Sequence, residues 1–235
     1  MPVFYVTQLI LPEAILDEDE SRHLVRVLRL KKDDPVDLVD GAGNLYKCAV
    51  AEADPRKTRL RILQTFREHL ARDYHLHIAI APTKSSDRFE WFLEKSTEIG
   101  IDEITPVFCQ RSERDRIRQD RSEKIILAAM KQSGRAYLPK LNPMIPFKEL
   151  LERVEAEYKY IAHCGTRTED LAEIPASSKL SWLVLIGPEG DFTPDELKMA
   201  TGLNYIELSL GEAVYRTETA GILACQQIRF LNMGL

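Results

Sequence analysis

The sequence lacks the features that identify several common classes of protein. No apolar run approaches the roughly 18 residues that span a membrane, and the N-terminal segment MPVFYVTQLI has no charged leader. Neither the phosphate-binding pattern G-x-x-x-x-G-K-S/T nor the dinucleotide-binding pattern G-x-G-x-x-G occurs. We therefore expect a cytoplasmic protein that is neither a nucleotide hydrolase nor a dinucleotide oxidoreductase.

Cysteine is scarce and scattered. The chain has four, far apart and without a C-x-x-C pair: Cys48, Cys109, Cys164 and Cys225. This spacing indicates neither a zinc knuckle nor a disulfide framework. His75 and His77 can project from one face of a strand as metal ligands do, but no further ligand at a suitable spacing completes a site. We expect no bound metal.

A general excess of positive charge is also missing, because the formal net charge is −5. Phosphate binding needs local positive charge whatever the total, and two basic clusters are present. The first contains Arg22, His23, Arg26, Arg29, Lys31 and Lys32, and the second Arg111, Arg114, Arg116, Arg118, Arg121 and Lys124. Acidic residues lie beside or within both, so each is compatible with a solvated face as well as with a nucleic-acid-binding face.

What is present is a globular composition, 44% hydrophobic and 29% charged, in 235 residues. Residues 1 to about 70 show short apolar runs separated by turns, typical of a small β-barrel, at 4–6, 35–39, 45–50 and 58–63. Between them, residues 19–30 fit a helix that places Arg22, Arg26 and Arg29 on one side. The polar stretch 67–73 is the expected domain boundary.

From residue 75 onward, strand and helix patterns alternate, which predicts an α/β domain with a mostly parallel sheet. Strands are expected at 75–80, 104–108 and 158–164, and helices at 87–99, 125–130 and 147–157. Gly100 is suited to end the first helix, and Asp120 with Glu123 to begin the second.

Two strand-to-turn-to-helix corners between residues 182 and 220 organise the chain. In the first, the apolar run LVLI stops at GPEG, and TPDE at 193–196 matches a capped helix start with proline at its first position. In the second, an alternating strand stops at Gly211, and Arg-Thr-Glu-Thr at 216–219 leads into an apolar helix. Glycine at the carboxyl end of a strand lets the backbone approach a ligand, so both bends predict a binding site.

The segments GPEGDFTPDE and LSLGEAVYRTETA closely resemble the signature of the SPOUT methyltransferases, and within them the RsmE family of ribosomal RNA uridine-N3 methyltransferases. The likeness extends to APTKSSDRFEWFLEKSTEIGIDEITPVFCQRS and to the N-terminal SRHLVRVLRLKKDDPVDLVDGAGNLY. It implies an α/β fold with a SPOUT-type trefoil-knot methyltransferase domain at 74–235, preceded by a small PUA-like RNA-binding β-barrel domain at 1–70. It also implies S-adenosylmethionine as cofactor, a uridine N3 of 16S rRNA in the small ribosomal subunit as methyl acceptor, and a homodimer.

The resemblance also implies the site residues. The cofactor would be bound by His163, Leu185, Ile186, Gly187, Pro188, Glu189, Gly190, Leu208, Ser209, Leu210, Gly211, Val214, Tyr215, Arg216 and Thr219. RNA would be bound by Arg22, His23, Arg26, Arg29, Lys84, Lys95, Arg111, Arg114 and Arg135. The permanently cationic Arg216 suits the stabilisation of a uracil anion, and Glu218 or Glu189 could be the general base, with helix capping as the alternative role of each carboxylate.

Some positions depart from the family's pattern. Asp191 stands where glycine is common, Glu212-Ala213 follow the second bend where a basic residue is frequent, and Lys131 replaces a usual glutamate. The first two changes add negative charge beside the expected cofactor site. Two other functions stay open, methylation of another RNA atom such as a ribose 2′-hydroxyl, and a non-catalytic RNA-binding assembly factor.

Overall fold

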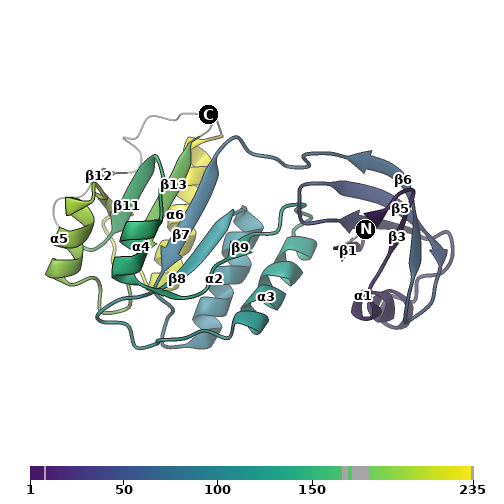
Figure 1. The fold of residues 1–235 in the computed structure, drawn as a ribbon, viewed down its shortest axis with the longest axis horizontal. Helices are drawn as coiled ribbons and strands as arrows, with labels where there is room; N and C mark the ends of the chain where they lie inside the picture. Colours follow the sequence, from purple (N-terminus) through teal and green to yellow (C-terminus); the bar gives the residue numbers. More distant parts are fainter. Residues whose placement is uncertain (8, 166–168, 171–179, 234–235) are drawn as a thin grey trace. The chain divides into compact units, whose positions relative to one another are not determined.

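The computed structural model describes residues 1–7, 9–165, 169–170 and 180–233, and the chain forms two compact units (Figure 1). The N-terminal unit combines Met1–Ala71 with Leu127–Leu138, and the C-terminal unit combines Arg72–Ile126 with Pro139–Leu235. In the described part of the chain no helix is long and apolar enough to cross a membrane.

The N-terminal unit is built on a curled sheet with the strand order β1-β4-β5-β6-β3-β2. Its strands are β1 (Val3–Tyr5), β2 (Leu9–Ile10), β3 (Glu13–Ile15), β4 (Pro35–Val39), β5 (Leu45–Glu52) and β6 (Arg59–Phe66). The register of β5 against β6 shifts at two points, and such bulges increase the twist of a strand pair. Phe4, Leu24, Leu38 and Leu60 are fully buried in its core. The expected mostly-β unit is present.

The single helix expected at 19–30 is wrong in its second half. Helix α1 (Glu18–Arg22) begins at Asp17, whose carboxylate accepts a hydrogen bond from the Glu20 N–H at 2.8 Å. A π-helical segment, η1 (His23–Val27), follows directly, and Arg29 lies beyond it with φ +56°. The wider turn and the left-handed residue end the 3.6-residue spacing that would have aligned Arg29 with Arg22.

The C-terminal unit contains a parallel sheet with the order β10-β8-β7-β13-β11-β14-β12, and β9 also pairs with β8. The strands are β7 (His75–Ile80), β8 (Glu103–Phe108), β9 (Lys140–Leu141), β10 (Ile145–Pro146), β11 (Tyr158–Ala162), β12 (Glu169–Asp170), β13 (Ser181–Ile186) and β14 (Ile206–Ser209). Every described strand pair is parallel. The order brings the carboxyl ends of β11, β13 and β14 together, although β13 and β14 are separated in the sequence by a helix.

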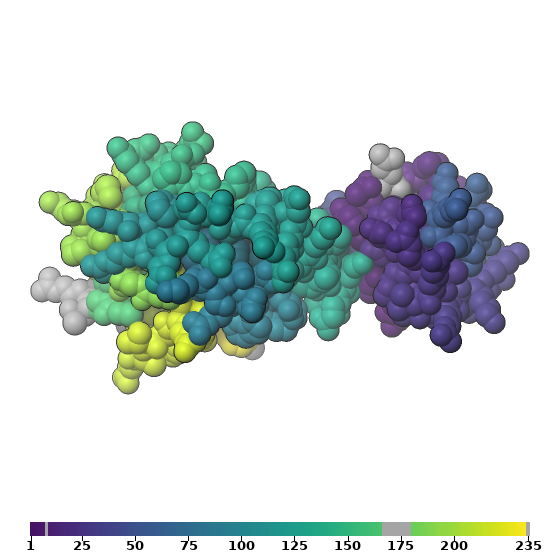
Figure 2. Space-filling view, turned by 90° about the horizontal axis from the view of Figure 1, so that it is seen from below, coloured from purple at the N-terminus to yellow at the C-terminus, as the bar shows by residue number. Residues whose placement is uncertain are grey.

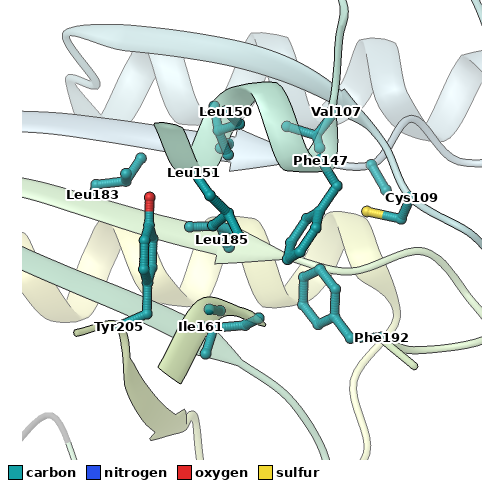
Figure 3. Close-up of a cluster of buried hydrophobic side chains, with 13 residues drawn as sticks. Val107, Cys109, Phe147, Leu150, Leu151, Ile161, Leu183, Leu185, Phe192 and Tyr205 are labelled. Carbon is teal, nitrogen blue, oxygen red and sulfur yellow. The ribbon is translucent and has the colours of Figure 1, made fainter. Parts of the chain in front are cut away.

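Helices cover both faces of this sheet, so β13 is buried along almost its whole length. Helices α4 (Phe147–Arg153) and α5 (Pro194–Gly202) pack on one face around Leu183 and Leu185 (Figure 3). Helices α2 (Ser86–Ile99) and α6 (Thr217–Leu231) lie side by side on the other face, blue-teal and yellow in Figure 2. A Cβ added to Gly221 of α6 would lie 2.6 Å from the Phe92 ring of α2, so a glycine permits this close packing.

Most of the expected helices and strands are present, with different ends. Gly100, with φ +108°, ends α2 as predicted. Helix α3 (Gln119–Gln132) starts earlier than expected, so Asp120 lies inside it rather than at its cap. Helix α4 ends at Arg153 instead of continuing to residue 157, because Val154 adopts an extended conformation.

A buried histidine lies near the amino-terminal end of β7. His77 is 4% exposed, and its Nε2 is 2.7 Å from the Thr105 hydroxyl. Burial lowers the pKa of His77 to about 4, so the ring is neutral at pH 7. Among the described residues no group of three or more His, Cys, Asp or Glu side chains could hold a metal ion.

Candidate active site

A cavity of about 470 Å³ lies at the carboxyl ends of β11, β13 and β14, beside the first turn of α6. It is lined by residues 162–165, 186–189, 191, 208–217 and 220. The two bends that the sequence singles out therefore form the walls of one cavity. A third wall, at 162–165, comes from the strand that lies between β13 and β14.

The backbone at the two bends depends on glycine. A Cβ on Gly187 would lie 3.1 Å from the ring of Phe192, which packs beneath the first bend. Gly211 has φ +126°, a conformation that other residues rarely adopt. Asp191, where the family commonly has glycine, has φ +60°, and Asp tolerates this left-handed region better than most residues. The substitution thus keeps the turn and adds a carboxylate to the cavity wall.

Side chains from distant parts of the C-terminal unit hold the first bend. The Arg111 guanidinium donates a hydrogen bond to the Gly190 carbonyl at 2.7 Å, and the Thr217 hydroxyl donates one to the Gly187 carbonyl at 3.0 Å. The Glu189 carboxylate accepts a hydrogen bond from the Lys84 N–H at 2.9 Å. The first bend is therefore fixed to α6 and to the segments before α2 and after β8.

His163 orders the third wall. Its Nδ1 accepts a hydrogen bond from the Gly165 N–H at 2.9 Å, which requires an unprotonated Nδ1. Its Nε2 lies 2.8 Å from a carboxylate oxygen of Glu207 on β14, so Nε2 carries the proton and donates it. Only 6% of the His163 side chain is exposed. The ring thus connects the end of β11 to β14 through one defined tautomer.

Two ionisable side chains of the cavity, those of Arg216 and Cys164, lie in different surroundings. Arg216, at the N-cap of α6, is exposed and lines the cavity, and its guanidinium has no hydrogen bond or ion pair to another described residue. Burial and then the charge of Asp191 raise the pKa of Cys164, which keeps that thiol protonated at pH 7.

The two candidate bases lie in different surroundings. Glu189 lines the cavity, whereas Glu218 does not, is 7% exposed and has Arg88 Nε of α2 at 3.8 Å from one oxygen. The other oxygen of Glu218 is buried without a hydrogen-bond partner in the described part of the chain. The structure thus brings Glu189 and Arg216 together at the cavity and directs Glu218 towards α2.

Three of the expected cofactor-binding residues do not line the cavity. Leu185 points into the apolar cluster under α4 (Figure 3), Gly190 contacts Arg111, and Thr219 lies in the first turn of α6. Further residues line it as well: Ala162, Cys164, Gly165, Asp191, Glu212, Ala213, Thr217 and Ala220. The sequence placed only Asp191 and Glu212-Ala213 beside the site, and it missed the others, although most of them adjoin expected residues.

The expected RNA-binding residues fall into separate groups. In the C-terminal unit, Lys84, Arg111 and Arg114 adjoin the first bend, and Arg114 Nε donates a hydrogen bond to the Lys84 carbonyl at 2.8 Å. Lys95 forms ion pairs with Glu94 and Glu98 along α2.

The remaining candidates belong to the N-terminal unit. Arg22 pairs with Glu18 and Asp19, and the His23 ring packs edge-on against Phe4. Arg26 lies in η1, Arg29 follows it, and Arg135 follows α3.

The chain is similar to known proteins along nearly its whole length. A family model described as an RNA methyltransferase domain matches residues 71–229, and one described as an RNA methyltransferase PUA domain matches residues 16–63. Ribosomal RNA small subunit methyltransferase E of Mycobacterium bovis is 30% identical, over 98% of this chain and 92% of its own length.

Two solved structures are also similar to this chain over nearly its whole length. A probable rRNA methyltransferase from Porphyromonas gingivalis has 36% identity and a TM-score of 0.90, covering 99% of this chain and 98% of its own. Ribosomal RNA small subunit methyltransferase E from Neisseria gonorrhoeae, solved bound to S-adenosyl methionine, has 27% identity and a TM-score of 0.91, with the same coverage. The curled N-terminal sheet and the parallel C-terminal sheet are thus both shared with these proteins, as the fold expectation required.

Proposed function

This chain belongs to the ribosomal RNA small subunit methyltransferase E family, and from that membership we propose that it transfers a methyl group from S-adenosylmethionine to N3 of a uridine in 16S rRNA. The observation that carries the proposal is the single cavity shared by the two bends. Its volume of about 470 Å³ lies within the range of small-molecule sites, roughly 300–1,000 Å³.

The residues present fit this cofactor. Ile186, Leu208 and Val214 offer apolar surface, and Gly187 and Gly211 let peptide groups approach a ligand closely. The carboxylates of Asp191 and Glu212 add negative charge, which complements a cationic sulfonium compound. When bound, S-adenosylmethionine supplies an activated methyl group, so the protein's task is to position the acceptor and exclude water.

The chain's own contribution to the reaction centres on Arg216. The N3 of uridine is protonated at neutral pH and lies between two carbonyl groups, so loss of its proton places negative charge on the ring oxygens. A permanently cationic guanidinium without an internal partner can donate hydrogen bonds to such an oxygen. Arg216 therefore stabilises the uracil anion, whose N3 proton passes to solvent water, and Glu189 holds the first bend through its hydrogen bond from the Lys84 N–H.

Four further features complete the proposal. Residues 1–70 form an RNA-binding PUA-like module, and 74–235 form the methyltransferase domain with a knotted C-terminal segment. The match of residues 71–229 to the RNA methyltransferase family model supports this domain, and the knot follows from the family resemblance. A homodimer is supported by the exposed apolar side chains of Phe230 and Met233 near the C-terminus. A ribosomal substrate supports a cytoplasmic site of action.

The proposal is tested with purified protein, labelled S-adenosylmethionine and small ribosomal subunits from a strain that lacks the gene. We expect label on one uridine base of 16S rRNA, mapped by mass spectrometry, and no label with an Arg216→Ala variant that still binds the cofactor. Label on a ribose would assign the chain to 2′-hydroxyl methylation. No label, together with no calorimetric binding of S-adenosylmethionine, would assign it to a non-catalytic assembly factor.

A further inference from the structure

A second cavity, of about 200 Å³, lies between the starts of helices α2 and α3 in the C-terminal unit. We propose that this cavity binds a phosphate of the RNA backbone next to the methylated nucleotide, through Arg114, Arg118 and Ser122. The proposal rests on the function given above and adds a subsite outside the methyl-donor cavity. A water occupies roughly 30 Å³ in the liquid, so the space accommodates a tetrahedral phosphate group.

The charges that line this cavity favour an anion. Three arginines, Arg114, Arg118 and Arg121, face the carboxylates of Asp87 and Glu90, which leaves a net positive charge. Arg121 holds Glu90 through two contacts of 2.6 and 2.7 Å, so this carboxylate is already neutralised. The Arg118 guanidinium has no hydrogen bond or ion pair to any other described residue, and Arg114 uses only its Nε internally. Both keep donors free for a ligand.

A hydroxyl group also faces the space. Ser122 of α3 lines the cavity, and its hydroxyl can donate a hydrogen bond to a ligand oxygen. Across the cavity, the side chain of Ser85 does not cap α2, which leaves the first N–H groups of that helix available to an anion.

One backbone segment connects this cavity to the methyl-donor cavity. The Lys84 carbonyl accepts a hydrogen bond from Arg114, which lines the second cavity, and the Lys84 N–H donates to Glu189, which lines the first. The two cavities therefore lie on either side of a single residue. An RNA nucleotide that enters the first cavity brings its flanking phosphodiester groups close to the second.

The test compares Arg118→Gln with Arg116→Gln, because Arg116 is an exposed neighbour that does not line the cavity. Affinity for small ribosomal subunits lacking the modification is measured at several salt concentrations, together with KM and kcat for methylation. We expect Arg118→Gln to weaken binding and to raise KM about tenfold, with kcat and S-adenosylmethionine affinity within twofold. The slope of log affinity against log salt should fall by about one, as for the loss of one phosphate contact.

The control variant should change affinity and slope by much less. Equal losses in the two variants, or a loss for Arg118→Gln without a change in slope, would overturn the phosphate subsite. A wild-type protein that methylates no subunit would instead contradict the proposed function, so the two failures are distinguishable.

Discussion

Replacing Glu189 by glutamine is expected to leave methyl transfer almost intact, whereas alanine at this position should impair it. The Glu189 side chain accepts a hydrogen bond from the Lys84 N–H at 2.9 Å, and a glutamine oxygen can accept the same bond. Alanine cannot, so the first bend would lose its connection to the segment before α2. Glutamine removes only the ability to take a proton.

The expected magnitudes separate the two roles of Glu189. A solvent-accessible hydrogen bond contributes about 1 kcal/mol, so its loss in Glu189→Ala should lower kcat/KM about fivefold. Loss of a general base typically lowers the rate by about 10²–10⁴-fold. If Glu189 only holds the bend, Glu189→Gln should stay within about twofold of wild type, on the scale set by that hydrogen bond.

The measurement is single-turnover methylation of small ribosomal subunits by the wild type and both variants across a range of pH, with S-adenosylmethionine affinity determined by calorimetry. The wild type and Glu189→Gln should show the same pH dependence. A hundredfold loss in Glu189→Gln, together with a changed pH profile and unchanged cofactor affinity, would refute the positioning role and make Glu189 the base.

Three further predictions concern stability of the C-terminal unit, which tryptophan fluorescence reports because Trp91 and Trp182 both lie in it. Glu196→Ala should lower the free energy of unfolding in urea by about 3 kcal/mol, because the Glu196 carboxylate accepts hydrogen bonds from the backbone N–H groups of Gln110 and Thr193. Thr193→Ala should lower it by only about 1 kcal/mol, as for the loss of one helix cap. Equal losses in the two variants would contradict this reasoning. Gly221→Ala should lower the free energy of unfolding by about 1–3 kcal/mol, because the added methyl group overpacks against the Phe92 ring of α2. Replacing Phe92 by a smaller residue in the same variant should recover part of this loss. An unchanged stability of Gly221→Ala would show that the two helices separate freely. The pKa of His77 is about 4 in the folded state and 6.5 in the unfolded state, so on acidification the unfolded state binds the proton first. The free energy of unfolding should therefore fall by about 3 kcal/mol as the pH drops from about 6.5 to 4. His77→Asn should flatten this pH dependence, and an unchanged slope would assign the acid loss to other groups.

The features predicted best from sequence are those encoded locally. The start of α5 is an example: a hydroxyl, a proline and a carboxylate within four residues give the complete capping box seen at Thr193 and Glu196. The end of α2 at Gly100 is another, because a left-handed residue there closes the helix. Each needs only neighbouring residues to form.

Sequence patterns gave wrong helix bounds where the same spacing of apolar residues is compatible with two backbone conformations. In η1, Leu24 is buried and Val27 is exposed, an arrangement that hydrophobic periodicity could not distinguish from an ordinary α-helix. The end of α4 failed for a similar reason, because the apolar Val154 continues the helical pattern while its backbone is extended.

The site shows the same division between local and distant information. The two bends were predicted because glycine marks each of them, but of the third wall at 162–165 only His163 was expected, through the resemblance, since only the strand order places β11 between β13 and β14. The hydrogen-bond partners of the bends could not be predicted from the sequence either, because Lys84 and Glu189 are separated by 105 positions. A motif can therefore identify a ligand-binding backbone without identifying what holds it in place.

Lys84 shows why those distant partners matter for function. The resemblance assigned it to RNA binding through its charge, yet its ammonium group is 2.8 Å from Glu113, and the nearby carboxylate raises its pKa. Its peptide groups make the connections that span the site, with the N–H bonded to Glu189 and the carbonyl to Arg114. Because backbone groups make both bonds, any residue except proline at position 84 retains them. The position of this segment, more than the charge of its side chain, thus relates the proposed methyl-donor cavity to the arginines proposed to bind RNA.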